Sequence, residues 1–158
     1  MALKWRHAGQ ACITANRVYV QKGVYDKFTQ ILTEKTKQLK VGHGSEQGTT
    51  MGPVTTARSL DKAEAQVADA QKMGGQVVMG GKKLHGTQGY DGYFFEPTVI
   101  TGAKDDMLIA REETFAPIMA LFEFDSEEEV VKLANDTSMG LASCTFFQTR
   151  ENARFSAC

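Results

Sequence analysis

The chain has 158 residues, 42% of them hydrophobic and 23% charged, and its formal net charge at pH 7 is -1. These values are typical of one globular domain. They exclude a strong general attraction to nucleic acid, and no apolar run reaches the roughly 20 residues of a membrane helix. The three cysteines lack the number and spacing of a disulfide framework or a zinc site. We therefore expect reduced thiols, an intracellular protein, and no metal, nucleic-acid or membrane partner.

The first half of the chain predicts one strand and two helices. Residues 17–21 are β-branched and aromatic, which predicts a buried strand. Apolar residues recur at helical spacing over residues 24–40, which predicts an amphipathic helix. A glycine-rich loop over residues 42–50 precedes a second helix over about residues 60–70. Gly74 and Gly75 stand where a helix typically ends.

The next segment predicts two extended stretches with a loop between them. Residues 76–79 have the composition of a short strand. The polar, glycine-rich stretch from Gly80 to Gly92 predicts a loop. Residues 93–100 predict an extended segment, in which Pro97 argues against a central hydrogen-bonded position.

The last part of the chain predicts two further strands around a third helix. Residues 117–124 form a strongly apolar strand, and Ser126 with Glu129 has the spacing of a capping box at a helix start. Residues 142–147 predict another core strand, which would bury Cys144. Strands that alternate with helices indicate an α/β fold with a mostly parallel sheet covered on both faces.

A candidate nucleophile lies near the start of the chain. The stretch from Gly9 to Cys12 places a thiol just after a glycine-containing turn. A thiolate attacks carbonyl carbon well, and backbone N–H groups at such a turn can stabilise an oxyanion. The alternative is that Cys12 is a small buried hydrophobic residue, which is the commoner role of a lone cysteine.

Several segments resemble the aldehyde dehydrogenase superfamily. Gly9-Gln10-Ala11-Cys12 is similar to the family's active-site cysteine motif, and residues 111–117 are similar to its Glu-Glu-x-Phe-(Gly/Ala)-Pro motif. Further matches follow in the same order along the chain: Gly52-Pro53, Gly80-Gly81, Phe95 to Thr98, and Asn135 to Leu141. The resemblance covers essentially the whole chain. It implies the three-layer α/β catalytic domain of that family, truncated in this chain.

The resemblance also implies a reaction and a set of site residues. Cys12 would attack an aldehyde, a hydride would pass to NAD or NADP, and water would release the acid from the resulting thioester. Glu113 matches the glutamate that binds the nicotinamide ribose, and Phe115 matches the aromatic residue that packs near the nicotinamide. Without the resemblance, Glu112 and Glu113 would be a solvated pair and Phe115 a core residue.

Arg6 suggests the substrate class. The stretch from Lys4 to Cys12 is most similar to the succinate-semialdehyde dehydrogenases, in which an arginine six residues before the nucleophile contacts the substrate carboxylate. A guanidinium can bind a carboxylate through two parallel hydrogen bonds. The alternative is a surface arginine in a charge pair. His7 departs from the asparagine that is common at its position, so an aldehyde specific to another pathway remains an alternative.

The resemblance predicts that residues 1–158 are the nucleophile-bearing catalytic domain, incomplete at both ends. In the family, the general-base glutamate, the oxyanion-hole asparagine and the cofactor-binding domain precede the nucleophile. Residues 149–158 have the pattern of a helix that is cut short. We expect this chain alone to be a weak dehydrogenase or an inactive one. The family implies a cytoplasmic or mitochondrial homo-oligomer, and the alternative is a non-catalytic homologue that binds or regulates a full-length aldehyde dehydrogenase.

Overall fold

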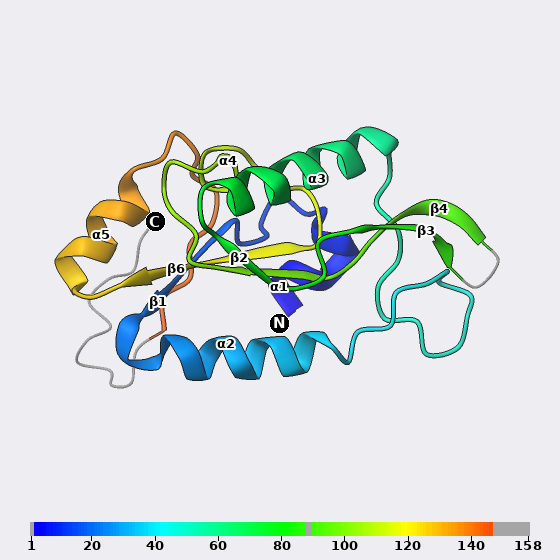
Figure 1. The fold of residues 1–158 in the computed structure, drawn as a ribbon, viewed down its shortest axis with the longest axis horizontal. Helices are drawn as coiled ribbons and strands as arrows, with labels where there is room; N and C mark the ends of the chain where they lie inside the picture. Colours follow the sequence, from blue (N-terminus) through cyan, green and yellow to red (C-terminus); the bar gives the residue numbers. More distant parts are fainter. Residues whose placement is uncertain (1, 88–89, 147–158) are drawn as a thin grey trace.

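A four-stranded sheet, in the order β1-β6-β5-β2, forms the centre of the chain (Figure 1). The computed structural model describes residues 2–87 and 90–146. Strands β1, β6 and β5 are parallel, whereas β2 runs antiparallel to β5. The predicted mostly parallel sheet is therefore confirmed. The strands span Arg17–Gln21 (β1), Gln76–Met79 (β2), Thr98–Thr101 (β5) and Ile118–Phe124 (β6).

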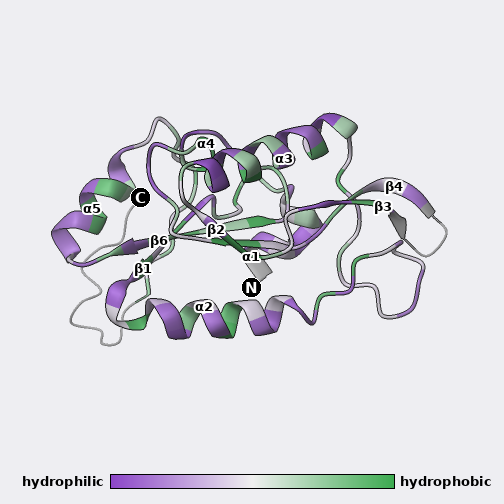
Figure 2. Cartoon of the chain, in the orientation of Figure 1, coloured by the Kyte–Doolittle hydropathy of each residue, from purple (hydrophilic) through white to green (hydrophobic). Residues whose placement is uncertain are grey.

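Two long helices cover opposite faces of this sheet (Figure 1). Helix α2, Lys22–Thr36, lies on one face, and α3, Ala57–Lys72, lies on the other. Hydrophilic and hydrophobic positions alternate along both helices (Figure 2). Each helix thus turns an apolar side to the sheet and a polar side outward, which gives the expected three layers. No helix in residues 2–87 and 90–146 is long and apolar enough to span a membrane.

Strand β6 is buried on both sides and divides the core into two clusters. Alternate side chains of a strand point to opposite faces of the sheet. Accordingly, Ile118, Ala120 and Phe122 pack in the cluster beneath α3, whereas Met119 and Leu121 pack in the cluster beneath α2. This double burial explains why the sequence of β6 is continuously apolar rather than alternating.

The predicted loop from Gly80 to Gly92 is wrong. Strands β3, Lys83–Thr87, and β4, Tyr90–Phe95, form an antiparallel hairpin that covers most of that stretch and continues past Gly92. The predicted extended segment 93–100 is divided between β4 and β5. The hairpin forms because its two strands pair with each other. A polar, glycine-rich composition is more typical of loops, so the residues alone did not indicate this pairing. The division falls next to Pro97, which cannot donate a ladder hydrogen bond.

Helix α5, Glu127–Asn135, begins as predicted. The Ser126 hydroxyl accepts a hydrogen bond from the Glu129 N–H at 3.2 Å, and the Glu129 carboxylate accepts one from the Asp125 N–H at 2.8 Å. These bonds satisfy backbone donors at the helix start. No residue of α5 is buried. The short helix α4, Leu108–Arg111, lies before β6 and was not predicted.

The predicted core strand 142–147 is wrong for its described residues. Residues 142–146 belong to no strand, and Cys144 is exposed rather than packed in a core. Phe146 is 90% exposed. An apolar run becomes a strand only when another strand pairs with it, and in the described chain none pairs with this run. Phe147 and the predicted helix 149–158 lie outside the described residues.

Candidate active site

Cys12 occupies an exposed turn that leads into β1. The turn is closed by the Thr14 N–H, which donates to the Ala11 carbonyl oxygen at 2.9 Å. The Thr14 hydroxyl donates to the same oxygen at 2.9 Å. Because the thiol is exposed, Cys12 is not the small buried hydrophobic residue of the alternative interpretation. Its sulfur is accessible to a substrate from solvent.

A left-handed backbone segment precedes this turn. In the short 3-10 helix η1, Arg6–Gly9, three consecutive residues have positive φ: His7 (49°), Ala8 (53°) and Gly9 (77°). Such a conformation is unfavourable for residues with a Cβ and is typical of functional sites held by their surroundings. A Cβ on Gly9 would overlap the carbonyl group of Ala116. The stretch from Gly9 to Cys12 and the motif at residues 111–117 are therefore in direct backbone contact.

The Gln10 side chain links the Cys12 turn to Thr55, just before the start of α3. Its side-chain oxygen accepts hydrogen bonds from the Thr55 N–H and from the Thr55 hydroxyl, both at 2.9 Å. Its side-chain nitrogen donates to the His7 carbonyl oxygen at 3.0 Å. Both the oxygen and the nitrogen of the Gln10 amide are therefore hydrogen-bonded. These bonds hold the backbone just before Cys12 against Thr55, which precedes α3.

Glu113 and Phe115 lie on the extended segment between α4 and β6. The two are exposed, whereas Thr114 between them is buried, as expected for alternating side chains. Both candidate cofactor residues thus point outward from one segment. Phe115 is 38% exposed, so it is not the core residue of the alternative interpretation. Glu112 lies 3.3 Å from the Lys62 ammonium, so the two neighbouring glutamates differ in their surroundings.

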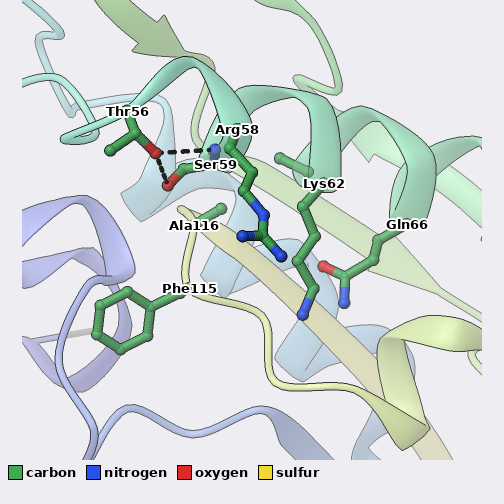
Figure 3. A pocket seen from close by; sticks show the side chains of 8 residues that line it. Thr56, Arg58, Ser59, Lys62, Gln66, Phe115 and Ala116 are labelled. Carbon is green, nitrogen blue, oxygen red and sulfur yellow. Dashed lines mark hydrogen bonds between the residues drawn. The ribbon is translucent and has the colours of Figure 1, made fainter.

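A pocket of about 130 Å³ lies beside Phe115 at the start of α3. Figure 3 shows Arg58 and Lys62 reaching from α3 toward the segment that carries Phe115. Arg58 can attract a negatively charged group, whereas Lys62 already lies beside the Glu112 carboxylate. Neither residue was singled out from the sequence, although their spacing of four residues places both on one helix face. The pocket is lined by Thr56, Arg58, Ser59, Lys62, Ala63, Gln66, Phe115 and Ala116.

Arg6 is exposed on η1, next to the buried Ala8 and Gly9. In the part of the chain that the structure describes, it forms no ion pair with an acidic side chain. The structure therefore leaves both Arg6 and Cys12 accessible, on consecutive turns. Within residues 2–87 and 90–146, no group of three or more His, Cys, Asp or Glu side chains could hold a metal ion.

The fold and the site together define an α/β domain with a thiol on an exposed turn. The sequence pattern described as the Aldehyde dehydrogenase family matches residues 1–157, and the chain belongs to that family. It is 47% identical over 146 residues to succinate-semialdehyde dehydrogenase [NADP(+)] 1 of Schizosaccharomyces pombe, which covers 92% of this chain and 29% of the relative. It is 43% identical to 3-sulfolactaldehyde dehydrogenase of Pseudomonas putida, over 98% of this chain and 30% of the relative.

Solved structures agree with this assignment. The crystal structure of an aldehyde dehydrogenase from Brucella melitensis biovar abortus 2308 matches with a TM-score of 0.91 and 47% identity. The match covers 97% of this chain and 30% of that one. A succinate-semialdehyde dehydrogenase from Burkholderia pseudomallei matches with a TM-score of 0.81 and 46% identity, over 86% of this chain and 27% of that one. The chain thus spans about 30% of the length of the relatives it matches.

Proposed function

We propose that this chain is the nucleophile-bearing part of a dehydrogenase that oxidises an aldehyde with an acidic group, succinic semialdehyde above all, using NAD or NADP. One observation carries the proposal. The exposed Cys12 turn is packed, through Gly9, onto the segment that presents Glu113 and Phe115. A nucleophile and a cofactor-binding segment must lie together if a substrate bound to one is to react with a cofactor bound to the other.

Cys12 begins the reaction. Its thiolate forms a carbon–sulfur bond with the aldehyde carbon and converts the carbonyl oxygen into an oxyanion, which backbone N–H groups of the turn can stabilise. When bound, NAD(P)+ supplies the hydride acceptor that the oxidation requires. The acyl group remains on the Cys12 sulfur as a thioester, and attack by water restores the thiol and releases the acid.

The residues around Phe115 fit a nicotinamide cofactor. The exposed Glu113 carboxylate can accept two hydroxyl hydrogen bonds from a ribose. The Phe115 ring, beside the pocket, offers a flat apolar surface. Arg58 supplies positive charge suited to phosphate groups, whereas Lys62 is paired with Glu112. We propose that Glu113 and Phe115 bind the nicotinamide half of the cofactor.

Arg6 is the proposed anchor for the acidic end of the substrate. The relatives' names support an acidic aldehyde, because succinate semialdehyde, glutarate semialdehyde and 3-sulfolactaldehyde each carry an acidic group. The Arg6 guanidinium is exposed and has no acidic partner within residues 2–87 and 90–146, so it is available to such a group. An aldehyde specific to another pathway is the alternative substrate.

We further propose that residues 1–158 are one part of the catalytic machinery of such an enzyme. The relatives are more than three times as long as the matched region. In the proposed arrangement, the general base for thioester hydrolysis and most of the cofactor site lie outside these residues. The 158-residue chain alone would then form the thiohemiacetal bond but release little acid.

The direct test measures NAD(P)H formation from succinic semialdehyde by the complete protein that carries these residues. We expect Cys12→Ser to reduce turnover by at least about a thousandfold, because a hydroxyl is a far weaker nucleophile than a thiolate. Cys144→Ser is the matched control, since Cys144 is the other exposed free thiol in the described chain. Undiminished turnover in Cys12→Ser would contradict the proposed role of Cys12.

A second candidate function is binding to a full-length aldehyde dehydrogenase, as a non-catalytic homologue. Large apolar side chains are exposed outside the site, and such surfaces commonly bind other proteins. They include Val24, Leu141 and Phe146. Co-expression with a full-length relative tests this function. If no mixed oligomer forms and the activity of the relative is unchanged, this function is wrong.

A further inference from the structure

Lys4 is a lysine without exposed surface. It lies in the short helix α1, Ala2–Trp5, eight residues before Cys12, and its side chain is buried completely. Its ammonium nitrogen Nζ donates a hydrogen bond to the carbonyl oxygen of Thr114 at 3.0 Å. No salt bridge to Lys4 occurs in residues 2–87 and 90–146. Because burying an ammonium is costly, this placement calls for a specific explanation.

The other backbone group of Thr114 is bound as well. Its N–H donates to the side-chain oxygen Oδ1 of Asn16 at 3.0 Å. Asn16 follows Cys12 by four residues, whereas Lys4 precedes it by eight. Side chains from both sides of the nucleophile thus hold the N–H and the carbonyl of one residue. That residue is buried and separates Glu113 from Phe115.

Glu113 is the charged residue that acts on Lys4. Burial lowers the pKa of Lys4 to about 8, and the negative charge of Glu113 opposes this decrease. The buried ammonium is thus attracted to the carboxylate of the residue directly before Thr114, whose carbonyl oxygen it binds.

We propose that Lys4 is a positioning residue for cofactor binding, which acts with Asn16 through the peptide groups of Thr114. The two side chains hold Glu113 and Phe115 on the outward side of their segment, in a fixed position relative to the Cys12 turn. Lys4 touches neither substrate nor cofactor. This inference rests on the proposed function, because it assigns a role to Lys4 within the same site.

The test compares Lys4→Met with the unchanged complete protein. Methionine matches the length of the buried chain but removes the ammonium. We expect the dissociation constant for NAD(P)H, measured by calorimetry in the absence of aldehyde, to rise about tenfold, as expected for a lost charged hydrogen bond. The rate at which iodoacetamide alkylates Cys12 without cofactor should change less than about twofold. A merely structural role would alter both measurements together.

Three further variants make the test specific. Asn16→Ala cuts the other bond to the same peptide and should weaken cofactor binding in the same direction. Combined with Lys4→Met, its effect should be less than additive, because both variants release Thr114. Lys4→Arg restores a cation and should recover part of the affinity. Lys27→Met removes an exposed lysine of α2 and should leave binding unchanged.

The outcomes separate this inference from the proposed function. If Lys4→Met and Asn16→Ala fold, as judged by near-ultraviolet circular dichroism, and bind NAD(P)H as before, the role of Lys4 is wrong although the proposed function stands. An equal loss of Cys12 alkylation also overturns it. If Lys4→Met fails to fold, the affinity of Asn16→Ala for NAD(P)H decides whether the contacts to Thr114 affect cofactor binding. If the unchanged complete protein neither binds NAD(P)H nor oxidises aldehydes, the proposed function fails, and the inference with it.

Discussion

Gly9 and Ala116 are in direct contact through their backbones, and this contact joins the stretch that carries Cys12 to the segment that carries Glu113 and Phe115. A Cβ on Gly9 would overlap the Ala116 carbonyl group, and it would lie 3.1 Å from the Pro117 nitrogen. Gly9 also has a φ of +77°. The position therefore requires glycine for two independent reasons, its left-handed backbone and the lack of space for a side chain.

Gly9→Ala should lower the free energy of unfolding by at least about 2 kcal/mol, because the methyl group forces the two segments apart. Urea unfolding of the chain measures this change. Gly23→Ala is the matched control. A Cβ at Gly23 meets nothing within 4 Å, and Gly23 lies in α2, so alanine there should stabilise by about 0.5–1 kcal/mol. Equal effects of the two substitutions would contradict the importance of the contact.

Lys4 should make the stability of the chain depend on alkaline pH. Burial lowers its pKa from 10.5 to about 8. Between these values the unfolded chain binds more protons than the folded chain, so folding stability rises with pH. The stability that depends on the protonation of Lys4 is fully present above the pKa of Lys4 in the unfolded chain, 10.5, and it is lost as the pH falls through about 8. It amounts to about 3 kcal/mol in total.

Urea unfolding at several pH values tests this dependence. Between about pH 7.5 and about pH 9.5, the unchanged chain should gain about 2 kcal/mol of stability relative to Lys4→Met, because the variant lacks the titrating group. The exposed-lysine variant Lys27→Met should follow the unchanged chain across the range. A constant difference between the unchanged chain and Lys4→Met would mean that the pKa of Lys4 is not lowered.

Gln10→Ala should loosen the Cys12 turn. The substitution removes both hydrogen bonds that Thr55 donates to the Gln10 side chain. We expect a loss of about 1–2 kcal/mol of stability and faster hydrogen exchange at the Thr55 N–H, measured by nuclear magnetic resonance. Gln10→Glu keeps an accepting oxygen, so it should protect the Thr55 N–H much as glutamine does. Rapid exchange in the glutamate variant would show that the bond is not what protects this N–H.

Arg6→Ala should change substrate preference more than reactivity. Without the guanidinium, kcat/KM for succinic semialdehyde should fall about 10-fold to 100-fold in the complete protein, because a charged, two-point contact is lost. For an uncharged aldehyde of similar length, kcat/KM should fall only slightly. Arg6→Lys keeps the charge but lacks the planar guanidinium. Its kcat/KM for succinic semialdehyde should therefore lie between those of the unchanged protein and Arg6→Ala. An unchanged preference in Arg6→Ala would exclude the proposed anchor.

Elements with local sequence patterns could be predicted from the residues alone. Strand β1 lies at the predicted residues 17–21, and the capping box at Ser126 starts α5 as expected. Helix α3 extends beyond the predicted 60–70 because Thr56 caps its start. Helix α2 begins at Lys22 and ends at Thr36 rather than spanning 24–40. Periodicity reports which residues favour a helix, whereas the exact ends depend on individual hydrogen bonds.

The two motifs that resemble the family could also be found from the residues alone, because chemistry depends on residue type and order. The contact between the two motifs in the fold could not be predicted in this way. The contact of Gly9 with Ala116, the burial of Lys4 and the position of Arg58 beside Phe115 all join segments that are distant in the chain. The hairpin of β3 and β4 and the exposure of Cys144 likewise depend on whether another segment pairs with them. Local patterning encodes the elements and their chemistry, whereas long-range packing decides which of those chemical groups act together.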